Sequence, residues 1–233
     1  MVPPLPVVAQ RRPPDEWNWD FAFEILPDLA EGLWLTIRIT IFGLLVAMTL
    51  GLVLAILRRS RLRIVRWPVG FFVEFVRSTP LLAQFFFLFF VLPDFGVTLS
   101  AMQIGVLGLG IHYACYTSES YRAGIESVPQ GQWEGATALS LSGTTTWRAV
   151  ILPQAVPTVI PALGNYLVAA MKDVPMVVIL GLLDVLGTAR SIQSQSFRPL
   201  EPITLAGVLF LAVSIPLAMF ARYLERRYAF QRE

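Results

Sequence analysis

Long apolar runs alternate along the chain with short polar connections that are rich in arginine. Because hydrocarbon offers no hydrogen-bonding partner for the backbone, a run of about 20 mainly apolar residues predicts a membrane-spanning helix. A shorter apolar run at 175–186 predicts a re-entrant or interfacial helix instead. The pattern therefore predicts an all-α integral membrane protein with about five membrane-spanning helices. The predicted spans are residues 32–57, 69–92, 99–123, 150–171 and 203–221.

The arginines predict the orientation of these helices, because cytoplasmic connections retain an excess of Lys and Arg. We therefore expect the N-terminus outside and the C-terminus inside. The predicted organisation is an external or interfacial segment at 1–31, a transmembrane domain at 32–222 with a cytoplasmic loop at 124–149, and a cytoplasmic tail at 223–233. The arginines follow the first, third and fifth spans, at Arg58, Arg59, Arg61, Arg63, Arg66, Arg122, Arg148, Arg222, Arg226, Arg227 and Arg232.

The first segment and the first span have distinct patterns. Residues 15–31 mix tryptophans and phenylalanines with carboxylates, which is typical of an interfacial helix or of a disordered acidic lead. The span that follows has small residues four apart, which share one helix face and favour close packing against another helix. These small residues are Gly43, Ala47, Gly51 and Ala55.

Composition excludes several classes of function. Of the 233 residues, 55% are hydrophobic and 15% are charged, and no basic patch of the kind that binds nucleic acid is present. One Cys and one His are too few for an internal disulfide or a structural zinc site, so no metal site is expected. The one lysine, Lys172, does not lie in a Walker A sequence, so the chain is not expected to bind ATP itself.

An enzymatic reading is weak. A membrane-embedded hydrolase would pair His112 with Ser118 or Ser120, but the chain has no G-x-S-x-G sequence and no second basic residue that clearly faces these groups. No repeated filter sequence indicates a passive channel either. We therefore expect no catalytic residues in this chain.

Several polar residues fall within or beside the predicted spans, where a charge needs a partner or water. Glu74 and Arg77 share a helix face and can neutralise one another. Alternatively, Pro80 breaks the helix there, and nearby polar groups line a solute pathway as in transporters with discontinuous helices. At the other polar positions, too, a structural ion pair and a place in a solute pathway both remain open. The candidate pathway residues are Glu74, Arg77, Thr79, Gln84, His112, Tyr116, Glu119, Asn165, Lys172 and Asp173.

The segment EGATALSLSGTTTWRAVILP, residues 134–153, resembles the cytoplasmic signature loop of bacterial ABC importer permeases. That loop has Glu-Ala-Ala, a Gly four positions after the second Ala, and an Ile-x-Leu-Pro step. Three positions depart from the pattern, with Gly135 for Ala, Ser140 for Gly and Val150 for Ile. The corresponding residues are Glu134, Gly135, Ala136, Ser140, Val150, Leu152 and Pro153.

Further stretches resemble the polar amino-acid subfamily of these permeases, which serves histidine, glutamine, glutamate and arginine. They include RSTPLLAQ and LPQAVPTVIPALGNYLVAAMKD, and the stretch SFRPLEPITLAG leans toward permeases for ectoine-type compatible solutes. The resemblance implies a type I importer transmembrane domain in the bacterial inner membrane. The implied partners are ABC ATPase subunits that bind ATP and magnesium, a second permease subunit, an external solute-binding protein and a small zwitterionic solute.

The residues of the signature loop fit a docking role. A helix with Gly135, Ala136 and Ala138 has little side-chain bulk, so a groove on a partner can approach its backbone. Glu134 adds a charge, which we expect near the N-terminal end of that helix, where the macrodipole favours it. Leu152 and Pro153 are expected to end the loop and set the angle of the next span. An ordinary amphipathic cytoplasmic helix is the alternative.

Overall fold

The computed structural model describes residues 16–229, and within them every regular element is a helix, as predicted. Short 3-10 and π segments occupy Phe87–Val91, Leu92–Phe95, Thr146–Ile151 and Val174–Leu180. The α-helices are α1 (Trp19–Arg58), α2 (Arg63–Arg77), α3 (Leu81–Phe86), α4 (Ala101–Glu126), α5 (Gln130–Ala138), α6 (Gly143–Thr145), α7 (Leu152–Asp173), α8 (Val185–Ser196) and α9 (Leu200–Ala229).

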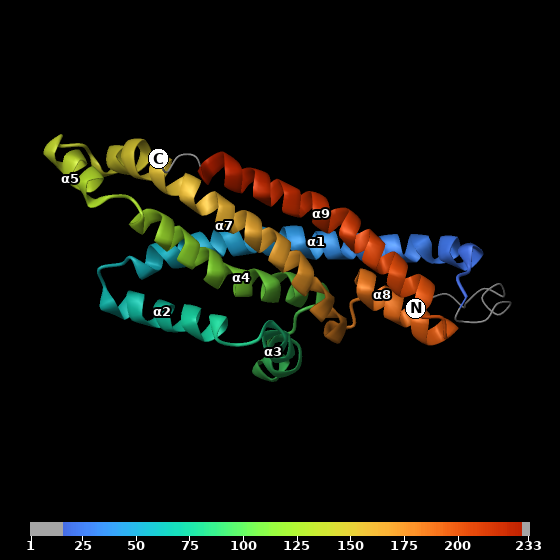
Figure 1. Cartoon of the computed structure of the whole chain (residues 1–233). Coiled ribbons are helices and arrows are strands. Elements are labelled where there is room, and N and C mark those ends of the chain that lie inside the picture. Colours follow the sequence, from blue (N-terminus) through green and yellow to red (C-terminus); the bar gives the residue numbers. More distant parts are fainter. Residues whose placement is uncertain (1–15, 230–233) are drawn as a thin grey trace.

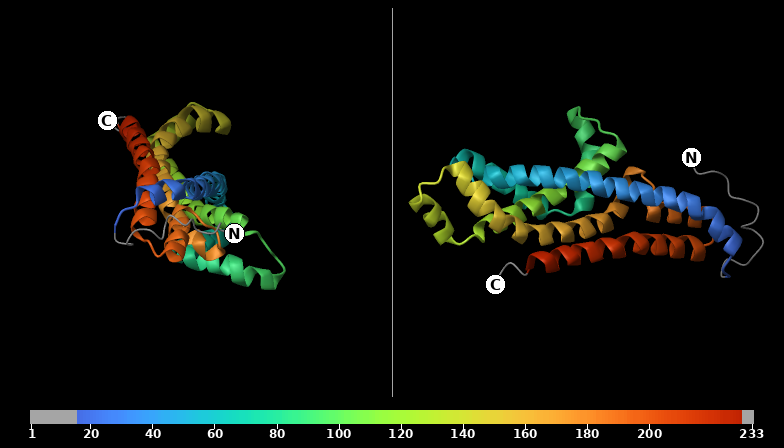
Figure 2. Two further views of the ribbon diagram at one scale, coloured as in Figure 1. Left: turned by 90° about the vertical axis from the view of Figure 1, so that its right-hand side faces the viewer. Right: turned by 90° about the horizontal axis from the view of Figure 1, so that it is seen from above.

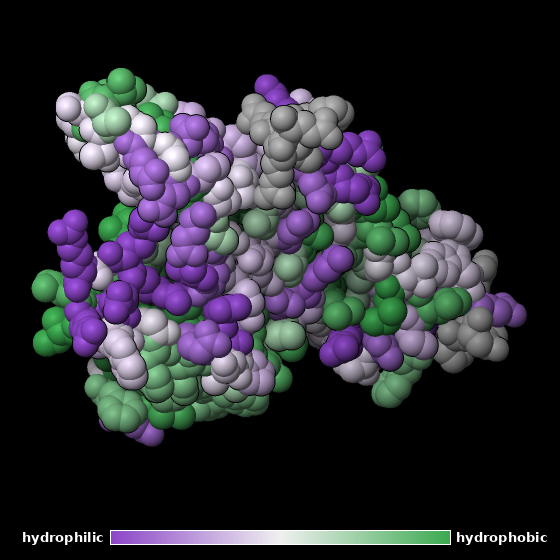
Figure 3. Space-filling model, turned by 60° about the vertical axis from the view of Figure 1, so that its left-hand side comes forward, coloured by the Kyte–Doolittle hydropathy of each residue, from purple (hydrophilic) through white to green (hydrophobic). Residues whose placement is uncertain are grey.

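The long helices form an elongated bundle. Helices α1, α4, α7 and α9 run along its length, and two perpendicular views show the same arrangement (Figures 1 and 2). Helix α5 and the C-terminal end of α9 lie at one end, whereas α8 and the start of α1 lie at the other (Figure 1). The segments predicted to be cytoplasmic therefore share one end. Hydrophilic side chains gather on that end, which comes forward in Figure 3.

Helix α1 is longer than the predicted first span. It begins at Trp19 instead of residue 32, because the Asn18 side chain caps it by accepting hydrogen bonds from the backbone N–H groups of Asp20 and Phe21. The helix continues through Pro27 to Arg58 without a break. From Trp19 on, the segment inferred to be interfacial forms the first turns of a continuous 40-residue helix, whereas residues 1–15 of the predicted N-terminal segment lie outside the described residues.

Close packing between α1 and α4 explains the stripe of small residues. A Cβ atom at Gly51 would lie 2.9 Å from the carbonyl oxygen of Ala114 and closer still to the Thr117 hydroxyl. The Thr117 hydroxyl donates a 2.8 Å hydrogen bond to the carbonyl of Ala47, which joins the two helices within the bundle. The stripe therefore serves helix packing, as predicted.

The predicted second span, 69–92, is wrong as one continuous helix. The chain bends by 108° between α2 and the helical segment from Leu81 to Phe95. The break lies at Ser78–Pro80, because Pro80 has no N–H to continue the helical ladder. The sequence predicts the proline-induced break at this position, but it does not predict the angle of the bend.

Three helical stretches in the described residues are long and apolar enough to cross a membrane: Trp19–Arg58, Gly143–Leu180 and Leu200–Tyr228. A fourth is added if the bent pair counts as one span. Helix α4, which corresponds to the predicted span 99–123, is not among them. It packs along α1 and buries most of its central residues, so the polar side chains of His112, Thr117 and Ser118 lie inside the bundle.

The short apolar run at 175–186 does not form the single helix that was predicted. Residues Val174–Leu180 form a 3-10 helix that ends at Gly181, where φ is +76°. A separate helix, α8, begins at Val185, and the Asp184 side chain caps it by accepting a hydrogen bond from the backbone N–H of Gly187. Burial raises the pKa of Asp184.

A buried ion pair joins the start of α1 to the start of α9. Arg198 and Glu201 are 1% and 0% exposed, and their Nη2 and Oε1 atoms are 2.6 Å apart. Glu201 Oε1 also accepts a 2.8 Å hydrogen bond from the backbone N–H of Asn18, and Arg198 donates to the carbonyl of Glu16. The pair therefore closes the end of the bundle opposite α5.

Replacing Arg198 by Ala is expected to lower the free energy of unfolding by about 3–5 kcal/mol, because Glu201 would keep a buried charge without its guanidinium partner. Thermal unfolding of the detergent-purified protein measures this loss. The exposed Arg222 on α9 provides the control, since Arg222→Ala removes the same side chain without a buried partner. Equal unfolding temperatures for the two variants would contradict the proposed role of the pair.

Candidate coupling helix and intramembrane polar site

Helix α5 carries the core of the expected coupling loop and projects from the end of the bundle (Figure 1). Glu134, Gly135 and Ala138 are exposed, whereas Ala136 packs inward. A Cβ atom at Gly135 would meet nothing within 4 Å, so packing inside the chain does not explain the missing side chain. The next residue after the helix, Leu139, is 74% exposed. This surface therefore presents backbone and an apolar side chain to any partner.

The position of Glu134 corrects one expectation. Helix α5 begins at Gln130, so Glu134 is in the middle of a nine-residue helix instead of near its N-terminal end. The macrodipole acts mainly within the first and last turns, so it gives this carboxylate little support. The charge remains available on the exposed surface.

Two tryptophans hold α5 against the bundle. Trp133 on α5 and Trp147 pack edge to face with ring centroids 5.5 Å apart, above a small core that contains Val128 and Ile151. The guanidinium of Arg59, just after α1, lies 5.8 Å from the Trp147 ring centroid. These contacts join α5 to the end of α1 and to the helical segment that precedes α7. The spacing of residues along the sequence did not predict these contacts.

The turn after α5 explains the glycine of the signature-loop pattern that this segment resembles, at the place where this chain has Ser140. Ser140 has φ of +51°. The Leu141 N–H donates a hydrogen bond to the carbonyl of Ala136, which closes a turn of six residues. This is the geometry of a Schellman cap, in which glycine avoids the strain of the left-handed region. Leu152 and Pro153 are the first residues of α7, but they do not end the loop as expected, because the continuous helical stretch already begins at Gly143.

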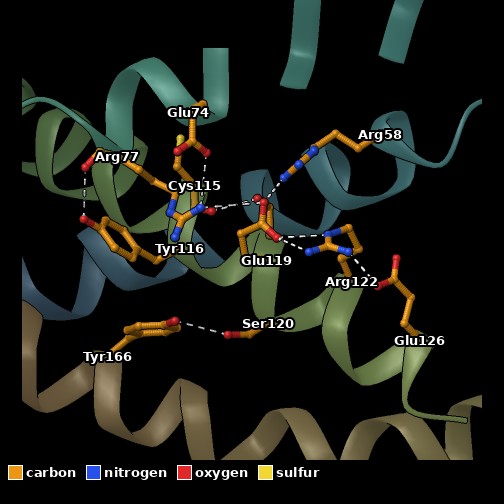
Figure 4. Close-up of polar contacts among 11 residues, drawn as sticks. Arg58, Glu74, Arg77, Cys115, Tyr116, Glu119, Ser120, Arg122, Glu126 and Tyr166 are labelled. Carbon is orange, nitrogen blue, oxygen red and sulfur yellow. Dashed lines mark hydrogen bonds and ion pairs between the residues drawn. The ribbon is translucent and has the colours of Figure 1, made fainter. Parts of the chain in front are cut away.

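Glu119 is the centre of the polar site between the helices (Figure 4). Its carboxylate pairs with Arg58 from the end of α1 and with Arg122, one turn further along α4, at 2.7 Å. Arg77, at the end of α2, lies 3.8 Å away and also pairs with Glu74 at 3.4 Å. Arg58 and Arg122 were expected only as signals of orientation. The structure shows them as ion-pair partners of Glu119.

Thr79, Gln84 and His112 meet at the break between α2 and α3. The Gln84 amide donates to the Thr79 hydroxyl at 2.9 Å and to the carbonyl of Val76 at 2.8 Å, which satisfies the exposed C-terminal end of α2. Its oxygen lies 3.2 Å from His112 Nδ1. These three predicted residues therefore hold the bend in place.

Tyrosines connect the remaining predicted residues. Tyr113 donates a 2.7 Å hydrogen bond to the Asp173 carboxylate, and the Tyr116 hydroxyl contacts the carbonyl of Arg77 at 3.4 Å. Tyr166 shares a 3.2 Å hydrogen bond with Ser120 (Figure 4). The i, i+4, i+7 spacing finds Tyr116 but not Tyr113 or Tyr166, which lie beside it only in the folded bundle.

Two predicted pathway residues lie outside this network. Asn165 and Lys172 are exposed, and they take part in none of the contacts just described. Gly164, next to Asn165, allows α7 to pack closely against Ala221 of α9.

His112, Ser118 and Ser120 do not have the arrangement that a membrane-embedded hydrolase would need. The Ser118 hydroxyl donates to the carbonyl of Cys115 at 2.8 Å, Ser120 pairs with Tyr166, and His112 pairs with Gln84. Across residues 16–229 no group of three or more His, Cys, Asp or Glu side chains is arranged to hold a metal ion.

Comparison with known proteins gives consistent matches along most of the chain. The family model described as "binding-protein-dependent transport system inner membrane component" matches residues 47–230. A probable amino-acid ABC transporter permease of Sinorhizobium fredii, y4tG, is 45% identical over 216 residues, which cover 90% of this chain and 94% of that protein. The arginine transport system permease ArtQ of Bacillus subtilis is 31% identical over 213 residues, which cover 90% of this chain and 97% of that protein.

Solved structures share the same fold. An amino acid ABC transporter crystallised with histidines matches with a TM-score of 0.84 and 29% identity, over 91% of this chain and 99% of that one. An inward-facing structure of the MetNI methionine ABC transporter matches with a TM-score of 0.66 and 17% identity, over 91% and 99% of the two chains, which shows likeness of fold.

Replacing Ser140 by Gly is expected to raise the free energy of unfolding by about 1 kcal/mol, because glycine adopts the left-handed conformation without a Cβ clash. Thermal unfolding of the purified protein measures the gain. Ser142→Gly is the matched control in the same loop, and it should lower stability slightly because the Ser142 hydroxyl caps α6. A Ser140→Gly protein no more stable than the parent would contradict the strain at this turn.

Proposed function

We propose a solute class and a coupling mode for this chain from one premise: the chain belongs to the family of binding-protein-dependent transport system inner membrane components. It is a permease subunit of the bacterial inner membrane, and it is a transport component instead of an enzyme. The chain moves a polar amino acid or an amino-acid-like zwitterion, such as ectoine, into the cell. An external solute-binding protein delivers that solute, and the permease pairs with a second permease subunit.

Two kinds of observation support this solute class. The similar proteins of Sinorhizobium and Bacillus are named as amino-acid and arginine permeases, and a solved amino acid transporter has the same fold at 29% identity. The polar site of this chain also offers both signs of charge, with Arg77 at the end of α2 and Asp173 at the end of α7. A zwitterion carries both charges and needs both kinds of partner. A permease for another small solute is the alternative.

The coupling proposal rests on Gly135. Its position on a projecting helix, with no neighbour in the chain within 4 Å of a Cβ, is explained if the backbone of α5 enters a groove of a separate ATPase subunit. The partner supplies ATP and magnesium, because this chain lacks a Walker A sequence and is proposed to bind no cofactor itself. Trp133 and Trp147 then pass the movement of α5 to the spans.

Replacing Gly135 by Trp is expected to reduce solute-stimulated ATP hydrolysis and uptake about tenfold or more, because the indole would fill the space that the partner occupies. The variant should insert in the membrane and unfold at the same temperature as the parent, since a Cβ atom at position 135 meets no neighbouring side chain or distant backbone within 4 Å. The test uses the complete importer, with its ATPase and binding protein, in proteoliposomes supplied with labelled glutamine, arginine, histidine or ectoine.

Gly143→Trp is the control, because position 143 is equally open but lies outside α5. It should retain uptake. Full activity of Gly135→Trp would contradict the coupling proposal. Transport of a sugar or phosphate, with none of the four zwitterions, would instead contradict the solute class while leaving the permease family intact.

A further inference from the structure

A basic groove lies between α2 and the ends of α1 and α4, toward the end of the bundle that carries α5 (Figure 1). It has a volume of about 450 Å³. Arg58 ends α1, Arg66 lies in the first turn of α2, and Arg122 lies near the end of α4. Glu74 of α2 is the one acidic residue in the lining. The groove therefore gathers positive charge at the end that is predicted to be cytoplasmic.

The carboxylates in and beside the groove leave one positive charge unbalanced. Arg66 is exposed, and no carboxylate among residues 16–229 lies within 4.0 Å of its guanidinium. Arg58 and Arg122 both pair with Glu119, and each guanidinium has five N–H donors, so donors remain for a further anion (Figure 4). The groups that meet here are Arg58, Arg66, Arg77 and Arg122 against Glu74, Glu119 and Glu126.

Gly70 keeps the middle of the groove open. It lies inside α2, where glycine lowers helix stability relative to alanine. A Cβ atom at position 70 would meet nothing within 4 Å, so packing within the chain does not explain the missing side chain. Arg66, Gly70 and Glu74 are four residues apart and share one helix face. A side chain at position 70 would therefore project into the groove, and its absence leaves room for a group from outside the chain.

Aromatic side chains form the outer edge of the groove. Trp67 and Phe71 line it and are 75% and 70% exposed. Phe71 stacks on Phe75 with ring centroids 6.2 Å apart, which continues the apolar surface along α2. The buried residues of α2, Val73 and Val76, lie on the opposite face, so the rings point away from the bundle. Exposed rings beside arginines are typical of the boundary between lipid headgroups and acyl chains.

We propose that this groove binds an anionic phospholipid, with the headgroup phosphate among Arg58, Arg66 and Arg122. The acyl chains then lie along the exposed rings of Trp67 and Phe71. Guanidinium groups bind phosphate oxygens through paired N–H donors, and basic pockets between helices on the cytoplasmic side of a membrane hold anionic headgroups. A soluble phosphate would use the arginines but leave the rings in water. The inference does not depend on which solute the chain transports.

Lipid binding to the detergent-purified permease–ATPase complex tests the inference, and native mass spectrometry counts the bound molecules. The probes are dioleoyl phosphatidylglycerol, dioleoyl phosphatidylcholine and glycerol phosphate. Phosphatidylglycerol should bind about tenfold tighter than phosphatidylcholine, because its headgroup carries a net negative charge. Glycerol phosphate has the anionic group without acyl chains, so it should bind at least about tenfold weaker than phosphatidylglycerol.

Two substitutions in the groove test its charge and its open space separately. Arg66→Gln should weaken binding of phosphatidylglycerol about fivefold and leave that of phosphatidylcholine unchanged, because it removes one positive charge. Arg222→Gln, at an exposed position of α9, is the control for charge and should have no effect. Gly70→Leu should weaken phosphatidylglycerol binding about tenfold by filling the groove. Gly207→Leu, at an equally open position of α9, should retain it. Thermal unfolding shows that each variant is folded.

Equal binding of the two lipids would overturn the inference, and so would full phosphatidylglycerol binding by Arg66→Gln or Gly70→Leu. Glycerol phosphate that binds as tightly as phosphatidylglycerol would assign the groove to a soluble phosphate and overturn the lipid site. A groove covered by the second permease subunit or by the ATPase would show no lipid preference in the complex, which also contradicts the proposal. None of these results bears on the proposed function, which uptake by the complete importer judges separately.

Discussion

Charge balance around Glu119 is the constraint on which the arrangement of the bundle depends. A carboxylate on a helix in the middle of a membrane protein requires a counter-charge, and Glu119 obtains it from Arg58 at the end of α1 and from Arg122 on its own helix. Arg77 adds a third positive charge from the end of α2. These pairs fix the relative positions of α1, α2 and α4 toward the end of the bundle that carries α5.

The same principle explains the bent helix. A break in a membrane-spanning helix leaves carbonyl groups without partners, and a proline makes such a break at Pro80. Gln84 meets the requirement by donating to the carbonyls of Val76 and Thr79, and His112 holds the Gln84 amide from α4. Gln84 and His112 therefore stabilise the fold at this point, and their place in a solute pathway stays a prediction. Asp173 differs from them because its partner is the Tyr113 hydroxyl and no basic nitrogen between residues 16 and 229 lies within 4.0 Å of its carboxylate.

Much of the fold could be predicted from the sequence, because hydropathy alone locates the long helices and arginine placement separates the two ends. The signature loop was also predictable as a helix followed by a Leu-Pro step. The early start of α1, the separate helix α8 and the angle at Pro80 were not, since they depend on local caps and on neighbours distant in sequence. Tyr113 and Tyr166 were missed for the same reason: they become neighbours only when α4 and α7 pack together.

The central claim is that α5 is the surface through which a cytoplasmic ATPase drives this permease. Thiol crosslinking in membranes tests it most directly, in a Cys115→Ala background with one new cysteine at Ala138 on α5 or at Thr98 in the connection before α4. Both positions are exposed. The account predicts a crosslinked product between the ATPase subunit and the Ala138→Cys protein, and none with Thr98→Cys. A product from Thr98→Cys together with none from Ala138→Cys would contradict both the coupling surface and the orientation of the chain.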